Sequence, residues 1–196
     1  MAAGIVSWGV YLPYWRLDRG AIGAAFGTPP GKGTRAVASY DEDTTTLGME
    51  AARRALDFAE VPDPDDLYFS TPAPAYMDKT NATTIHAALG LSASSGAYDL
   101  CGSVRSGWAT LTLSALSGEQ RPSMAVISDL RTGLAGGAEE SQAGDGAVAF
   151  VFAPEGGVAE LIGQASATDE FLDRWRVPGE SASHQWEERF GEEAYL

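Results

Sequence analysis

The chain has 196 residues, of which 44% are hydrophobic and 20% charged, a composition typical of folded globular domains rather than of disordered chains. Its 27 acidic and 13 basic residues give a net charge of −14, which argues against a broad electrostatic interaction with nucleic acid or with an anionic membrane surface. No apolar run reaches the ~20 residues of a membrane span, and the opening lacks the features of a signal or transit peptide, so we expect a cytoplasmic protein.

The first part of the chain is predicted to alternate strands with helices. Residues 4–12 are rich in branched and aromatic side chains and predict a strand that ends at Pro13. A short helix over 17–26 is predicted from a possible N-cap at Asp18 and a stop at Gly27. Residues 27–42 are expected to form an exposed loop. A long helix then begins at Asp43 or Thr44, runs to Glu60 and carries an apolar stripe.

The rest of the pattern continues the alternation of strands and helices. Strands are predicted over 67–70, 96–100 and 124–130, helices over 81–89 and 103–116, and a Gly-rich loop over 133–144. Two further strands, over 147–153 and 158–165, are expected to pair as a hairpin across Pro154–Gly157. The fold class predicted from this order is α/β, with a mixed, mostly parallel five-stranded sheet and helices on its faces.

The composition changes near the end of the chain. Residues 168–196 contain 8 acidic and 3 basic residues and carry Trp175 and Trp186. We therefore predict a domain over 1–167, followed by an acidic, Trp-containing excursion or tail over 168–196.

The single cysteine marks the most informative point for chemistry. Cys101 follows the predicted strand 96–100 and precedes the predicted helix at 103, where unpaired helical N–H groups would stabilise a thiolate. Such a thiolate could attack a thioester carbonyl, and the N–H groups of the same turn, Gly102 among them, could hold the oxyanion. A small, buried core residue is the competing interpretation.

One cysteine also excludes an internal disulfide, fits a reducing cytosol and, with only two histidines, argues against a metal site.

Several short motifs, in order along the chain, carry a family resemblance. They are the opening GIVSWGVYLPYWRL, the segment SYDEDT followed by MEAAR, DLC followed by Gly107, ISD at 127–129, GDGA at 144–147, and the stretch 171–196 with WR at 175–176 and FGE at 190–192. Together they resemble the thiolase superfamily, especially its 3-hydroxy-3-methylglutaryl-CoA synthase branch of archaeal type, over essentially the whole chain.

The resemblance implies an acyl-CoA enzyme in which Cys101 is the nucleophile of a Claisen-type step that forms or breaks a carbon–carbon bond. The CoA thioester is then a substrate, and no tightly bound cofactor is implied. Arg16 resembles a position near the CoA entrance of the family. Lys79 and Arg105 could meet the phosphates of CoA, although solvated surface charge is the simpler explanation of both residues.

Two departures from the family pattern bear on activity. Pro72 stands at or next to the position where the synthase branch has a glutamate that acts as general acid and base, and Asp78 does not match that position. The family's second half, which supplies its catalytic histidine, has no counterpart, and neither His86 nor His184 lies in a matching motif. We expect His86 to pack in a helix and His184 to be exposed.

Two main hypotheses follow. The first is a thiolase-type acyltransferase that needs a homodimeric or heteromeric partner carrying the other half. A zinc-ribbon and OB-fold acyl-CoA-binding protein is a further partner that the resemblance suggests. The second is a non-catalytic structural or regulatory half-domain that completes a thiolase-fold partner. A third possibility is an acidic α/β domain that keeps only the inherited scaffold.

Overall fold

The computed structural model describes residues 3–29, 31–170, 172 and 174–186. These residues fall into two compact units. The first comprises 3–16, 36–130 and 144–163, and the second contains the described residues of 17–35, 131–143 and 164–186. The second unit therefore combines residues beyond 168 with two earlier segments, whereas the sequence predicted a single boundary at 167. That residues 168–196 form an acidic excursion or tail stays a prediction.

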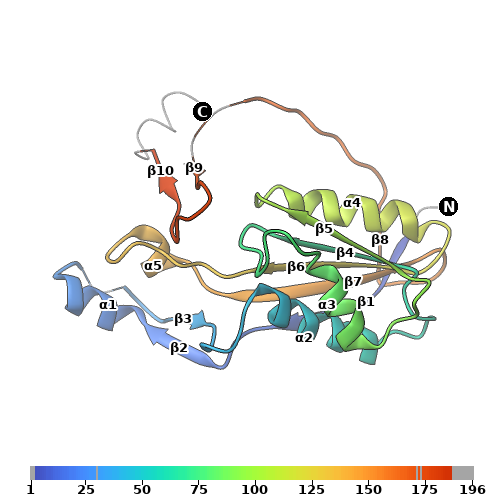
Figure 1. Ribbon diagram of the computed structural model, residues 1–196, viewed down its shortest axis with the longest axis horizontal. Coiled ribbons are helices and arrows are strands. Elements are labelled where there is room, and N and C mark those ends of the chain that lie inside the picture. Colours follow the sequence, from blue (N-terminus) through green and yellow to red (C-terminus); the bar gives the residue numbers. More distant parts are fainter. Residues whose placement is uncertain (1–2, 30, 171, 173, 187–196) are drawn as a thin grey trace. The chain divides into compact units, whose positions relative to one another are not determined.

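The first unit is built on a six-stranded mixed sheet (Figure 1). The strand order across the sheet is β5 (Gly96–Cys101), β4 (Asp66–Thr71), β6 (Ser123–Asp129), β7 (Gly146–Ala153), β1 (Gly4–Tyr11) and β8 (Ala159–Glu160). The pairs β5–β4 and β4–β6 are parallel, and the remaining three pairs are antiparallel. The α/β class and the mixed sheet were predicted correctly; the sheet has six strands instead of the expected five, and all six lie in segments that were predicted as strands.

The last strand of the sheet does not form the predicted hairpin. Strand β8 pairs with β1, not with β7, so β1 lies between the two strands that were expected to be neighbours. Gly156 and Gly157 have φ values of 81° and 108°, which glycine adopts readily, and a Cβ atom at Gly157 would lie 2.6 Å from the Ile5 carbonyl oxygen of β1. The Val158 amide then donates to the Ile5 carbonyl at 2.8 Å. The prediction was wrong because local turn residues do not specify which strand is the partner.

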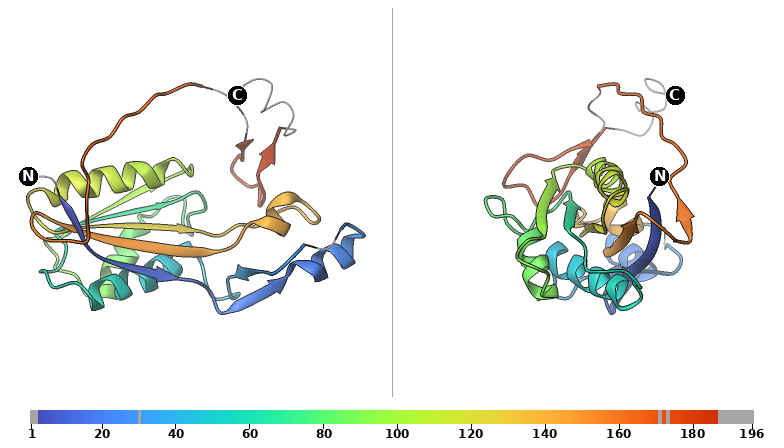
Figure 2. Two further views of the ribbon diagram at one scale, coloured as in Figure 1. Left: turned by 180° about the vertical axis from the view of Figure 1, so that it is seen from behind. Right: turned by 90° about the vertical axis from the view of Figure 1, so that its right-hand side faces the viewer.

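Helices cover both faces of this sheet, as the end-on view in Figure 2 shows. Helix α4 (Ser106–Gly118) lies on one face, and α2 (Thr44–Asp57) and α3 (Ala82–Leu89) lie on the other. Asp43 is the N-cap of α2, in a reciprocal capping box in which the Thr46 amide donates to Asp43 Oδ1 and the Asp43 amide donates to Thr46 Oγ1, both at 2.8 Å. Among the described residues, no helix has the length and apolar character that a bilayer crossing requires.

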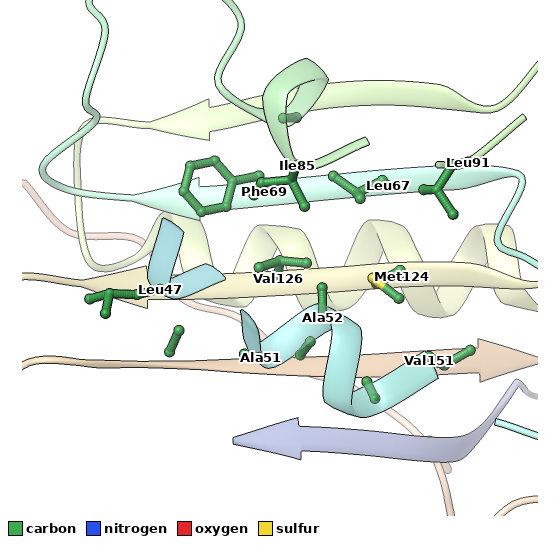
Figure 3. Close-up of a cluster of buried hydrophobic side chains, with 14 residues drawn as sticks. Leu47, Ala51, Ala52, Leu67, Phe69, Ile85, Leu91, Met124, Val126 and Val151 are labelled. Carbon is green, nitrogen blue, oxygen red and sulfur yellow. The ribbon is translucent and has the colours of Figure 1, made fainter. Parts of the chain in front are cut away.

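Most of the hydrophobic core lies between the sheet and the pair α2–α3 (Figure 3). Leu47, Ala51 and Ala55 of the predicted apolar stripe are fully buried against the strands. They pack with Leu67 and Phe69 of β4 and with other residues of the cluster, Ala52, Ala82, Ile85, Leu91, Met124, Val126, Ala147, Ala149 and Val151. A smaller cluster of Ala3, Ala115, Ala125 and Phe152 lies on the α4 side. The helical periodicity therefore identified the core-facing side of α2 correctly.

The second unit consists of short elements. Helix α1 (Arg19–Phe26) begins at its predicted cap, where Asp18 accepts a hydrogen bond from the Gly20 amide, and ends at Gly27 with a φ of 66°. Helix α5 (Ala138–Gln142) lies within the predicted Gly-rich loop, and β9 (Arg174–Trp175) pairs with β10 (His184–Gln185). Glu139 forms ion pairs with Arg131 and Arg174.

The loop predicted over 27–42 also contains structure. Strand β3 (Thr34–Val37) pairs with β2 (Trp15–Asp18) in a two-stranded sheet. Neither strand showed an alternating apolar pattern, because most of their side chains are exposed or half-buried. Pairing with a distant segment, rather than local propensity, makes these residues strands.

Candidate functional site

The candidate site lies at the carboxyl ends of the adjacent parallel strands β4 and β5. Thr71 and Cys101 are the last residues of these strands and are register partners. The Gly102 amide donates to the Thr71 carbonyl at 3.2 Å, which extends the strand pairing by a further bond. Cys101 is exposed, so an exogenous molecule can reach its thiol.

Cys101 lies further from the helix than the sequence predicted. Helix α4 begins at Ser106 instead of at 103, and Gly102–Arg105 form the turn between strand and helix. The favourable interaction of an anion with a helix terminus is confined to about the first turn. The expected stabilisation of a Cys101 thiolate by α4 is therefore absent from this arrangement; Arg105 is the N-cap of α4, and Val104 in the preceding turn is 62% exposed.

The electrostatic surroundings of Cys101 favour the neutral thiol. Partial burial of the side chain raises the pKa of Cys101, and the negative charge of Asp99 on the same strand raises it further. The hydrogen bond to the Thr71 backbone acts in the opposite direction and is the smallest of the three effects. A low thiol pKa, which the sequence analysis expected here, is not what this structure provides.

The Gly102 amide was the sequence-predicted candidate for an oxyanion donor. In the structure this N–H points to the Thr71 carbonyl, and its residue has a φ of 119°, which only glycine adopts readily. The glycine is therefore explained by the turn geometry. An oxyanion contact from this amide would require the bond to Thr71 to open.

The three predicted CoA-binding cations lie in three different segments. Arg16 folds back on its own turn, where Nη1 donates to the carbonyls of Pro13, Tyr14 and Trp15. Lys79 Nζ donates to Thr84 Oγ1 at 2.5 Å and lies 5.0 Å from the centre of the Tyr76 ring. Arg105 is exposed at the start of α4. Lys79 and Arg105 thus both lie at helix entries that follow the two strands of the site, whereas Arg16 is occupied locally.

Of the residues that the structure describes, none is identified at this site as an equivalent of the family's acid–base groups. Pro72 follows directly after β4 and carries no carboxylate. His86 is half-buried on α3, with Nε2 2.9 Å from the Ser92 carbonyl oxygen. His184 is exposed, pairs with Glu180 at 2.8 Å and stacks on Trp175. The half-buried position of His86 in a helix and the exposure of His184 agree with the predictions.

Asp99 and Asn81 form a polar pair near Cys101 that was not among the predicted site residues. Asp99 on β5 accepts hydrogen bonds from the backbone amides of Asn81 and Ala82, each at 2.7 Å, and from the Asn81 side chain at 3.0 Å. The only sequence signal that Asp99 belongs to the site was its position two residues before Cys101, because alternate residues of a strand lie on the same face of the sheet.

Comparison with known proteins identifies the family. No protein-family profile matches the chain. The hydroxymethylglutaryl-CoA synthase of Methanocaldococcus jannaschii is 32% identical over 207 aligned positions, which include 99% of this chain and 60% of that protein. The corresponding synthase of Aeropyrum pernix is also 32% identical, over all of this chain and 57% of that protein. The chain corresponds to an N-terminal half of the thiolase-like hydroxymethylglutaryl-CoA synthase branch.

Solved structures agree with this assignment at the level of the fold. A crystal structure described as hydroxymethylglutaryl-CoA synthase complexed with CoA superimposes with a TM-score of 0.85, at 21% identity, over 94% of this chain and 50% of that chain. A 3-oxoacyl-(acyl-carrier-protein) synthase III gives a TM-score of 0.71 at 23% identity, over 82% of this chain and 52% of that chain. The predicted family and the predicted thiolase-like fold are therefore confirmed. The chain spans less than two thirds of the curated relatives it matches.

Proposed function

We propose that this chain is one half of an acyl-CoA acyltransferase of thiolase type, in which Cys101 receives the acyl group. The observation that carries the proposal is the similarity of the whole chain to hydroxymethylglutaryl-CoA synthases, together with an exposed cysteine at the carboxyl end of β5. Structural neighbours described as complexes with CoA or with 3-hydroxy-3-methylglutaryl-CoA support a CoA thioester as the substrate. The same assignment suggests a role in cytoplasmic lipid metabolism.

The first chemical step follows from the thiol and the thioester. The Cys101 sulfur attacks the acyl carbonyl, a new sulfur–acyl bond forms, and the bond between the acyl group and the CoA sulfur breaks. The thiol proton leaves Cys101 and ends on the CoA sulfur. A Claisen-type step at the acyl-enzyme then forms or breaks a carbon–carbon bond. Burial and Asp99 raise the pKa of Cys101, so a base or a cation beside the thiol would promote this step, and we propose that another polypeptide segment supplies it.

Exposed apolar side chains on β1 and α4 support the proposal of such a segment. Large apolar side chains of the first unit are exposed on β1 and on α4, including Trp8 (52%), Val10, Trp108 and Leu116. Trp8 and Val10 alternate with buried Ser7 and Gly9, so they face the side opposite to α2. An exposed set of this kind is typical of an interface. We propose that it is covered by a second thiolase-like half, from another copy of the chain or from a different protein, which also supplies the base.

The experiment that tests the catalytic proposal is the intact mass of the protein after incubation with acetyl-CoA and longer acyl-CoAs. Wild-type protein is expected to gain one acyl group, and the Cys101→Ala variant is expected to gain none. The incubation is repeated with any co-purified partner, including a zinc-ribbon and OB-fold protein. An acyl adduct that persists in Cys101→Ala, or no adduct with any thioester even when the partner is present, would refute the role of Cys101.

A non-catalytic half-domain is the second candidate function. It is favoured by the raised pKa of Cys101, by the hydrogen bond of the Gly102 amide to Thr71 and by the exposed, apolar Val104 in the turn before α4. Such a chain would bind and complete a thiolase-fold partner without forming an acyl-enzyme. The outcome that separates the candidates is a stable complex whose activity is unchanged by Cys101→Ala and lost with Trp8→Glu, which introduces a charge into the exposed apolar set.

A further inference from the structure

We propose that Asp99 is a positioning residue that fixes the loop 72–80 beside Cys101, acting through Asn81. The inference rests on the proposed role of Cys101 and adds a residue to it. Asp99 lies on β5, while Asn81 and Ala82 lie at the entry to α3, so the three hydrogen bonds between them join a strand to a helix start. A carboxylate that accepts several N–H donors forms charge-assisted bonds, which are stronger than neutral ones.

Asn81 transmits this anchor to the loop. Asn81 is 1% exposed, and both the oxygen and the nitrogen of its side-chain amide form hydrogen bonds. Asn81 Oδ1 accepts from the Tyr76 backbone amide at 3.0 Å, and Asn81 Nδ2 donates to the carbonyls of Tyr76 and Lys79 at 3.0 and 3.3 Å. Thr45 Oγ1 of α2 donates to Asn81 Oδ1 at 3.4 Å. The far part of the loop is therefore held by a side chain that Asp99 itself orients.

A second set of bonds anchors the beginning of the loop. The Ala73 amide donates to Thr71 Oγ1 at 3.1 Å, and Thr44 Oγ1 donates to the Ala73 carbonyl at 2.8 Å. Thr71 is the register partner of Cys101, so the loop leaves the sheet directly beside the thiol. Between its two anchors the loop exposes Tyr76 and Met77. Asp99 thus defines where these side chains lie relative to the site.

The charge of Asp99 gives the proposal a signature that simple scaffolding lacks. Asp99 and Cys101 lie on the same face of β5, and the carboxylate disfavours a nearby thiolate. Replacement of Asp99 should therefore loosen the loop and also make Cys101 more acidic. Replacement of Asn81 should loosen the loop without removing the charge.

The test combines hydrogen exchange of the Tyr76 amide with the pH profile of Cys101 alkylation by iodoacetamide, both on the full chain. In Asp99→Asn the Tyr76 amide is expected to exchange several-fold faster than in the wild type, and the alkylation profile is expected to move to lower pH. In Asn81→Ala the exchange is expected to increase while the profile stays in place. Asp78→Asn removes a loop carboxylate that is not part of this anchor, and it is expected to change neither.

The outcomes distinguish this inference from the proposed function. An unchanged Tyr76 amide in Asp99→Asn, or a profile that moves equally in Asp78→Asn, would overturn the positioning role. If Asp99→Asn does not fold, Asn81→Ala and the conservative Asp99→Glu decide: Tyr76 must lose protection in the first and keep most of it in the second. A wild type that forms no acyl adduct but shows the expected exchange pattern would refute the proposed function and leave the positioning role standing.

Discussion

The approach of α2 to β1 makes Gly9→Ala a stringent test of this fold. A Cβ atom at position 9 would lie 2.2 Å from the Ala51 carbonyl oxygen and 2.5 Å from the Ala55 nitrogen, both backbone atoms of α2. Ordinary contacts of a Cβ begin near 3.4 Å, so a rotamer change cannot relieve the clash and the helix backbone must move. Because Leu47, Ala51 and Ala55 are fully buried, that movement also opens the core.

The expected cost is at the upper end of the range for overpacked cores, about 3 kcal/mol in the free energy of unfolding. For a chain of this size it corresponds to a fall of roughly 6–12 °C in melting temperature. Chemical denaturation and thermal melting of the full chain measure both quantities. Gly163→Ala is the matched control, since nothing lies within 4 Å of its Cβ position, and it is expected to change stability by less than about 0.5 kcal/mol. A loss below about 1 kcal/mol for Gly9→Ala would contradict the described packing of α2 on β1.

Three further predictions follow from local features. Asp43→Ala removes the capping box of α2 and is expected to lower the free energy of unfolding by about 1 kcal/mol, whereas an unchanged denaturation midpoint would show that the cap contributes nothing. Tyr11 donates a hydrogen bond to Glu42, and this bond raises the pKa of Tyr11 to about 12. The contribution of the bond to stability is therefore complete below the ordinary tyrosine pKa near 10 and is lost as the pH rises through 12. Tyr11→Phe should remove the latest phenolate transition seen by ultraviolet absorbance, and its persistence in the variant would rule out this assignment. Cys101 should react slowly with iodoacetamide at neutral pH and faster under alkaline conditions, because its pKa is raised; rapid neutral alkylation would contradict the described surroundings of the thiol.

The elements whose ends are marked by local chemistry were predicted well. Asp18 and Gly27 cap the two ends of α1, Asp43 caps α2, and Gly90 ends α3. The φ values of Gly27 and Gly90 are 66° and 68°. Each of these signals depends on a side chain and a backbone group only a few residues apart. The family resemblance was also carried by short motifs in order, and the comparisons confirm it. Its motif at 190–192 lies outside the described residues.

The candidate site was predicted less completely. Cys101 was placed correctly at the end of a strand, but its distance from α4 and the effect of Asp99 depend on where the helix begins and which face the strand presents. The anchor formed by Asp99 and Asn81 joins residues 18 positions apart, and no local pattern marks such a bond. Arg16 illustrates the same limit, because the family resemblance suggested a position near the CoA entrance, whereas its side chain donates to three carbonyls of its own turn.

The sequence by itself determined the alternation of strands and helices, the buried face of α2, the helix caps and the thiolase-like family, because periodicity, capping and ordered motifs are properties of neighbouring residues. Only the tertiary structure decided that β8 pairs with β1, that β2 and β3 are strands, and that burial and Asp99 raise the pKa of the Cys101 thiol. These features depend on strand pairing, on burial and on charges brought close by folding. Such interactions join segments that are distant along the chain, so no local pattern specifies them.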